Sequence, residues 1–257
     1  IPTHQGRAAE HILSQIMIRP GQFVPGNMYF TTTKLHQELA GGVFADVIVD
    51  EAHDTQSTFP WKGNIDLDKL RALVKEHGAE KIAYISFEHS VNMAGGQPVS
   101  MDNMKEVYEY CSAREIPVFF DATRTVENAY MIQQHDPHFH ATPIRDILRE
   151  MLLYGDGCTV SGKKDFLINI GGVLCFREDA ELASESLLFL NGGMMTYHSW
   201  APITAAFDPD VIVLAGVTIG EGAVVGAVDD VKVANVIKNT EKKLSKFLEN
   251  LSTKAID

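Results

Sequence analysis

The chain has 257 residues, of which 45% are hydrophobic and 22% are charged, and this balance predicts a globular core and argues against overall disorder. Its formal net charge of -12 at pH 7, without a cluster of Lys and Arg, argues against nucleic acid as a partner. The apolar runs are shorter than the roughly 18 to 20 residues that span a bilayer, so we expect no membrane contact.

The cysteines and the first residues indicate a cytoplasmic protein. Cys111, Cys158 and Cys175 are widely spaced without a C-x-x-C pattern, so we expect core thiols in a reducing compartment. The opening IPTHQGRAAE does not resemble a signal peptide. Because the chain starts without Met at what already resembles a functional motif, we expect further sequence upstream.

Helical and strand-like segments alternate along the first 176 residues. In chain order we predict a helix at 8–18, a strand at 43–49, a helix at 66–77, a strand at 81–86, a helix at 101–114, a strand at 116–120, a helix near 144–154, and strands at 157–161 and 171–176. Gly78 is expected to end the second helix and Ser100 to cap the third. The alternation predicts an α/β domain with a mostly parallel sheet, whose ligand binds beyond the carboxyl ends of the strands.

The sequence changes character after residue 190, so we predict a first domain at 1–190 and an atypical tail at 191–257. Residues 211–228 alternate small and β-branched side chains with regular glycines, which is typical of short strands joined by tight turns. Residues 231–251 return to helical spacing with a lysine-rich polar face.

Asp121 and Lys164 are the first candidates for chemistry. Asp121 ends the apolar strand in VFFDATR, where a buried carboxylate needs a positive partner such as a protonated pyridine nitrogen. Lys163 and Lys164 follow another strand in CTVSGKKD, where a neighbouring cation and desolvation favour the neutral amine that forms an imine. The simpler interpretations are a helix cap or structural ion pair for Asp121 and surface charge for the lysines.

Anion-binding and ring-binding groups complete the requirements of a cofactor such as pyridoxal phosphate. Gln5, Gly6 and Arg7 precede a helix, whose free N–H groups attract an anion, and Ser161 adds a hydroxyl. Asn92 follows a strand and could reach a ring substituent, and Phe30 could stack on a ring. Taken alone, the first run is an ordinary helix entry, Asn92 is a turn residue and Phe30 belongs to the core.

The combined motifs PTHQGR, GNMYFTTT, VNMAGGQPVSM, FDATRTVENAY and SGKKDFLINIGG resemble the β-eliminating lyases, the family of the tyrosine phenol-lyases and tryptophanases. The resemblance covers residues 2–190, and MYFTTT, DATR and SGKKD are more similar to the tyrosine phenol-lyases. It implies the aspartate-aminotransferase-like fold, known as fold type I, for the large domain. It also implies pyridoxal 5'-phosphate as cofactor and the elimination of phenol or indole from an aromatic amino acid, with release of pyruvate and ammonia.

The resemblance implies a role for each motif residue. Lys164 would hold the cofactor through an imine and take part in proton transfer, with Lys163 in support. Asp121 would pair with the pyridine nitrogen, and Phe30 would stack on the ring. The remaining contacts would be Arg124 and Asn92 near the ring's 3-oxygen, Gln5, Gly6, Arg7 and Ser161 at the phosphate, and the backbone carbonyl of Asn169 at a monovalent cation, K⁺.

Two departures from the family keep other functions open. We recognise neither its N-terminal segment nor its C-terminal small domain, which supplies the arginine for the substrate carboxylate. The tail resembles the repeats of hexapeptide acyltransferases, so acyl transfer through the tail is one alternative. An indole-releasing enzyme and a fragment that binds cofactor without turnover are the others. The family resemblance also implies a homotetramer.

Overall fold

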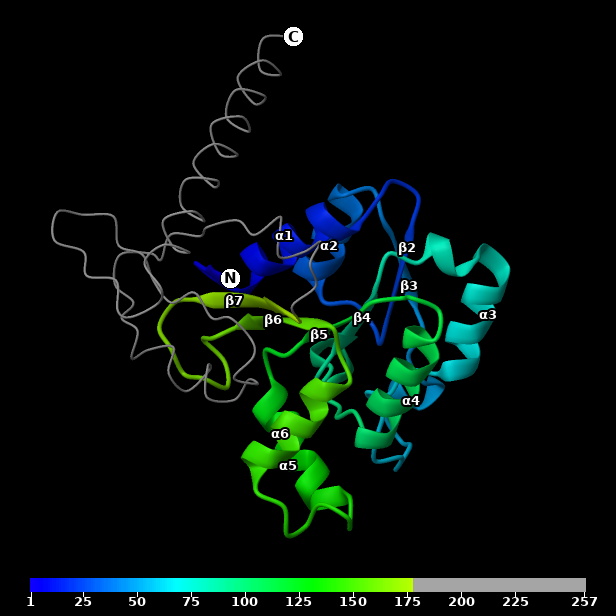
Figure 1. Ribbon diagram of the computed structural model, residues 1–257. Coiled ribbons are helices and arrows are strands. Elements are labelled where there is room, and N and C mark those ends of the chain that lie inside the picture. Colours follow the sequence, from blue (N-terminus) through cyan, green and yellow to red (C-terminus); the bar gives the residue numbers. More distant parts are fainter. Residues whose placement is uncertain (178–257) are drawn as a thin grey trace, which may run out of the picture.

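The computed structural model describes residues 1–177 (Figure 1). The predicted boundary at residue 190 and the tail at 191–257, with its repeats and helix, lie outside the described residues. The helices are α1 (Gly6–Met17), α2 (Thr31–Leu39), α3 (Leu67–His77), α4 (Met101–Ser112), α5 (Thr125–His135) and α6 (Ile144–Leu153). The strands are β1 (Pro2–Thr3), β2 (Phe23–Gly26), β3 (Val43–Asp46), β4 (Ile85–Glu88), β5 (Val118–Asp121), β6 (Gly157–Ser161) and β7 (Gly172–Phe176). Short 3₁₀ turns lie at Asp50–His53, Ala79–Lys81 and Asn92–Ala94.

The described strands form one sheet in the order β1-β7-β6-β5-β4-β2-β3. Strands β3, β2, β4, β5 and β6 are parallel, whereas β7 runs antiparallel to both β6 and β1. This arrangement confirms the predicted α/β class with a mostly parallel sheet. Each helix between parallel strands returns the chain across a face of the sheet, so the strands end at a common edge.

Helices cover both faces of the sheet. Figure 1 shows α1 and α2 on one face and α3, α4, α5 and α6 on the other. Strand β5 serves both layers, because Val118 and Phe120 belong to the larger core cluster whereas Phe119 packs in the smaller cluster beneath α1. The alternation follows from the period of two in a strand. A sheet buried on both faces leaves its carboxyl edge as the place where polar side chains gather.

Several predicted elements are confirmed, and their caps explain where they begin and end. The Asp66 carboxylate accepts hydrogen bonds from the N–H groups of Asp68 at 2.8 Å and Lys69 at 3.1 Å, which starts α3. Gly78, at φ 89°, ends that helix as predicted. Ser100 caps α4 as predicted, because its hydroxyl accepts the N–H of Asn103 at 3.1 Å.

Two predicted strands are misplaced. The strand predicted at 43–49 stops at Asp46, because the Asp46 carboxylate accepts the N–H of Ile48 at 3.0 Å and turns the chain. The strand predicted at 81–86 is regular only at Ile85–Glu88, since Ala79–Lys81 forms a 3₁₀ turn. The correction matters because it makes Glu88 the last residue of β4.

The helices α2 and α5 and the strands β1 and β2 are absent from the prediction. Strand β2 is four residues long and contains Pro25, which removes an N–H donor and obscures the strand pattern. Helix α2, TTTKLHQEL, starts with three β-branched residues and buries only Gln37 fully, so it lacks an apolar stripe. Both elements are held by their neighbours, as β2 lies between β3 and β4 and α2 packs on α1.

The cysteines are core thiols as expected, because Cys111, Cys158 and Cys175 are all buried and free. Within residues 1–177, each helix is too short or too polar to cross a membrane.

Candidate active site

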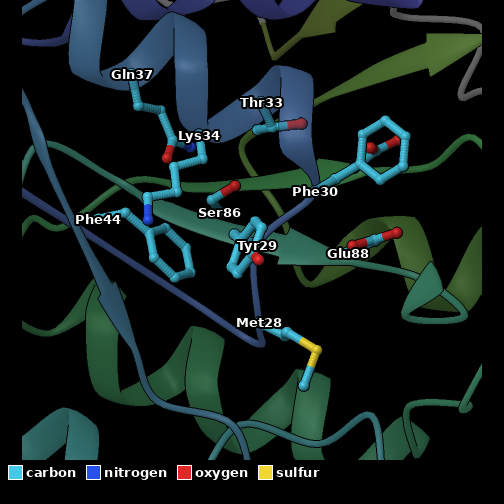
Figure 2. A pocket seen from close by; sticks show the side chains of 10 residues that line it. Met28, Tyr29, Phe30, Thr33, Lys34, Gln37, Phe44, Ser86 and Glu88 are labelled. Carbon is cyan, nitrogen blue, oxygen red and sulfur yellow. The ribbon is translucent and has the colours of Figure 1, made fainter. Parts of the chain in front are cut away.

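Polar residues from four elements meet at the carboxyl edge of the sheet. Strands β4, β5 and β6 end there at Glu88, Asp121 and Ser161, and Glu88 lies directly opposite Asp121 in the register. A pocket at this edge is lined by Met28, Tyr29, Phe30, Thr33, Lys34, Gln37, Phe44, Ser86, Glu88 and Asp121. Figure 2 shows Phe30 and Glu88 on one side of this pocket, across from Gln37, Lys34 and Phe44. The pocket lies where an open parallel sheet binds its ligands.

The start of α1 packs directly against the end of β6. A Cβ placed on Gly6 would lie 2.7 Å from the Cβ of Ser161, so only glycine allows this approach. The Lys163 ammonium donates a hydrogen bond of 3.4 Å to the Gln5 side-chain oxygen. Arg7 follows in the first turn and is exposed. Because the first turn of a helix leaves N–H groups free, Gln5, Gly6, Ser161 and Lys163 can together surround an anion.

We expect Gly6→Ala to damage both the fold and the anion site. Inserting a methyl group into this contact costs about 1 to 3 kcal/mol of the free energy of unfolding, which urea denaturation measures. The double variant G6A/S161G removes the Cβ that the new methyl group meets, so it is expected to recover part of that loss. Equal stability of G6A and the unchanged protein would show that the contact is looser than described.

Asp121 connects the ends of β5 and β6 through Thr123. The Asp121 carboxylate accepts the N–H of Thr123 at 3.1 Å, and the Thr123 hydroxyl accepts the N–H of Ser161 at 2.9 Å. Burial raises the pKa of Asp121, while its hydrogen bonds from Thr123 act in the opposite direction. The carboxylate is therefore fixed beside the anion site in surroundings that favour a positive partner.

Two further carboxyl groups, which the sequence analysis missed, lie near Asp121: Glu10 is buried and Glu88 is half-buried. Burial raises the pKa of Glu10, on α1, to about 7 and that of Glu88 to about 8, and the charge of Asp121 adds to both shifts. The Thr32 hydroxyl donates to the Glu10 carboxylate at 2.9 Å. Oxygen Oε2 of Glu88 is buried without a hydrogen-bond partner in the described part of the chain.

The acidic cluster of Glu10, Glu88 and Asp121 fits a cationic ring. Three neighbouring carboxyl groups cannot all be ionised at low cost unless a cation or protons join them. A protonated pyridine nitrogen supplies one positive charge, and the anion site beside Ser161 can take a phosphate. The described residues therefore fit pyridoxal phosphate. Glu10 could have been found from sequence, because it shares the buried face of α1 with Leu13 and Ser14.

Phe30, Asn92 and Arg124 occupy different surroundings. Phe30 precedes α2 and lines the pocket together with Asp121. Asn92 is exposed, and its backbone N–H donates to Glu88 Oε1 at 3.0 Å. The Arg124 guanidinium lies 3.0 Å from Glu127 on α5 and forms an ion pair there. The structure thus brings Asn92 to the acidic cluster, whereas the hydrogen bond of Arg124 is to α5.

Lys164 and Asn169 lie in the loop between β6 and β7, and both are exposed. Within residues 1–177, the Lys164 ammonium makes no hydrogen bond or ion pair, so the structure does not bring it into contact with Asp121. Its neighbour Asp165 anchors the loop, because the Asp165 carboxylate accepts the N–H groups of Val126 at 2.7 Å and Glu127 at 3.1 Å at the start of α5. Sequence reasoning missed this anchor.

The loops that carry the candidate residues hold strained backbone. Met28, Ser90 and Leu167 have φ values of 70°, 54° and 52°, and they lie close in sequence to Phe30, Asn92 and Lys164. Non-glycine residues adopt this conformation at a cost, and such strain is concentrated at functional sites.

Two buried asparagines, which sequence reasoning also missed, hold these loops through hydrogen bonds to the backbone. Asn27 binds the backbone N–H and C=O of Glu88, both at 2.8 Å. Asn128 accepts the N–H groups of Ser90 at 3.2 Å and Val99 at 2.8 Å. The neighbouring His89 is buried, forms a hydrogen bond of 3.1 Å with the Thr125 hydroxyl and lies against the ring of Phe120.

Comparison with known proteins gives consistent matches over this region. A family model described as Beta-eliminating lyase matches residues 1–253. The chain is 56% identical over 199 residues to the tyrosine phenol-lyase of Pasteurella multocida, covering 77% of this chain and 43% of that protein. It is 57% identical over 198 residues to that of Fusobacterium nucleatum, with the same coverage. The chain thus spans less than half the length of these relatives.

Similarity to solved structures is weaker. An archaeal alanine:glyoxylate aminotransferase matches with a TM-score of 0.47 and 20% identity, covering 68% of this chain and 39% of that one.

Proposed function

The chain belongs to the β-eliminating lyase family, and from this membership we propose that it is the cofactor-binding part of a pyridoxal-phosphate enzyme that converts L-tyrosine to phenol, pyruvate and ammonia. The observation that supports the proposal most directly is the acidic cluster around Asp121, beside the anion site at Gly6 and Ser161. The relatives named tyrosine phenol-lyase favour phenol over indole as the leaving group.

Each candidate residue then has a defined task. When bound, pyridoxal phosphate supplies an electron sink for the charge left on the substrate's α-carbon. Asp121 keeps that sink effective, because its carboxylate holds a proton on the ring nitrogen. Phe30 stacks on the ring and fixes its plane. Lys164 Nζ binds the cofactor covalently and moves the α-proton, with Lys163 beside it in support.

Other side chains position the cofactor's substituents. Gln5, Gly6, Arg7 and Ser161 hold the phosphate through N–H, guanidinium and hydroxyl donors. Arg124 and Asn92 reach the 3-oxygen of the ring. For Arg124 this contact requires its side chain to leave Glu127, to which it is bonded in the described structure.

Further properties belong to the same proposal. The backbone carbonyl of Asn169 contributes to a K⁺ site, the enzyme assembles as a homotetramer, and it works in the cytoplasm. Binding of the cofactor without turnover is the main alternative.

The experiment that tests the proposal is a titration of the purified protein with pyridoxal phosphate. We expect an absorbance band near about 420 nm, typical of a cofactor bound covalently to a lysine amine. After borohydride reduction of the bond between cofactor and lysine, the cofactor is expected to stay attached to the peptide that contains Lys164. Pyruvate released from L-tyrosine would support the full activity, a band without pyruvate would indicate cofactor binding alone, and the absence of a band would overturn the proposal.

A further inference from the structure

We propose that Glu88 is a positioning residue of the cofactor site, whose carboxyl group fixes the turn carrying Asn92 at a set distance from Asp121. The inference rests on the proposed function, in which Asn92 and Asp121 contact the same ring. Glu88 is the residue between them: it lies opposite Asp121 in the β4–β5 register, and its Oε1 accepts the Asn92 N–H at 3.0 Å.

The backbone of Glu88 is itself rigidly held. The Asn27 side chain accepts the N–H of Glu88 and donates to its C=O, both at 2.8 Å. The next residue, His89, donates its N–H to the Asp121 carbonyl at 3.0 Å. A carboxyl group on such a fixed backbone can hold the group that it binds at a set position relative to the sheet.

The turn that Glu88 holds needs this support. Ser90 adopts φ 54°, a conformation that costs free energy unless its surroundings impose it. Asn128 holds one side of the turn through the N–H of Ser90 at 3.2 Å. The Glu88 carboxylate holds the other side through Asn92. Losing that bond frees the exposed end of the turn, where Asn92 lies.

The second oxygen of Glu88 argues against a purely structural role. Oε2 is buried without a hydrogen-bond partner among the described residues, and Glu88 lines the pocket that also contains Phe30 and Asp121. Stability alone favours an apolar or fully bonded side chain at such a place. A carboxyl group bonded to Asn92 on one oxygen and left without a partner among the described residues on the other suits a site that receives a polar ligand.

Three variants of Glu88 separate the effect of side-chain length from the effect of charge. Glu88→Gln keeps an acceptor oxygen at the same distance but cannot ionise, Glu88→Asp can ionise but is one methylene group shorter, and Glu88→Ala removes the carboxyl group altogether. Glu106→Ala, on the exposed side of α4, serves as the control. If the alanine variant fails to fold, the Gln and Asp pair still decides the question.

Two measurements are made on each variant. Hydrogen exchange of the Asn92 amide in cofactor-free protein is expected to be about tenfold faster in E88A and E88D, and to change less than about threefold in E88Q and the control. The Kd for pyridoxal phosphate, measured by absorbance titration, should rise about tenfold in the same two variants and be retained in E88Q.

The outcomes distinguish this inference from the proposed function. Unchanged Asn92 exchange in E88A and E88D would overturn the positioning role. Weakening in E88Q as large as in E88D would also overturn it, since an acceptor oxygen at the same distance would then not be sufficient. If the unchanged protein binds no pyridoxal phosphate, the proposed function fails, and the role of Glu88 in that cofactor site fails with it. The exchange data would then still decide whether Glu88 holds the Asn92 turn.

Discussion

Replacing Lys164 with alanine is expected to abolish the absorbance band near about 420 nm and to lower pyruvate release by about ten thousandfold or more. Lys164 supplies both the covalent bond to the cofactor and the group that moves the α-proton, so one substitution removes two functions. The fold should be unaffected, because the side chain is exposed and makes no hydrogen bond or ion pair within residues 1–177. Absorbance titration, a pyruvate assay and thermal unfolding measure the three quantities.

The neighbouring lysine provides an internal comparison. Lys163→Ala removes the bond to Gln5 and a positive charge near the phosphate, so it should weaken cofactor binding while the band still forms at saturating cofactor. Lys105→Ala, on the exposed side of α4, serves as the matched control and should behave like the unchanged protein. A full band in K164A together with its loss in K163A would assign the covalent bond to Lys163 instead.

The alternation of helix and strand was enough to predict the sheet and the position of Asp121. An apolar run such as VFFD ends in a polar residue only where the strand leaves the core, and the structure places Asp121 at the end of β5. The same reasoning could have reached Glu88 if the strand had been placed at Ile85–Glu88. The shift arose because Ile82, Ala83 and Tyr84 are apolar and buried, although the regular strand begins only at Ile85.

The positions of the other site residues depend on tertiary contacts. Asp165 caps α5 by accepting the N–H of Val126, which lies 39 residues earlier in the chain. Asn27 accepts the N–H of Glu88, which lies 61 residues later. Nothing local in the sequence marks such long-range bonds. The exposed position of Lys164 likewise depends on how the β6–β7 loop is anchored.

Asp121→Asn is expected to affect function and stability in opposite directions. With the carboxylate gone, the ring nitrogen loses the charge that keeps it protonated, so pyruvate release should fall by about a hundredfold or more. The cofactor-free protein should instead gain stability at neutral and higher pH, because a buried acid that lacks a cation is no longer present. Asp102→Asn, on an exposed position of α4, is the control for both measurements.

The pH dependence of that gain follows from the raised pKa of Asp121. Because the folded protein binds the proton more tightly than the unfolded chain does, the stability from this group is complete at low pH and is lost as pH rises through the raised pKa. The loss therefore begins above the ordinary carboxyl range and continues through the raised pKa of Asp121. Thermal unfolding without cofactor should therefore show D121N and the unchanged protein nearly equal in acid, with the difference in Tm growing as the pH rises.

Pyridoxal phosphate is expected to reverse the order of the two proteins. A cation bound beside Asp121 stabilises the unchanged protein more than it stabilises D121N, since only the carboxylate gains a charged partner. The acidic cluster would then be destabilising until the site is filled, which couples cofactor binding to folding. A Tm difference that does not depend on pH, or that cofactor leaves unchanged, would show that Asp121 keeps its proton throughout and does not pair with the ring.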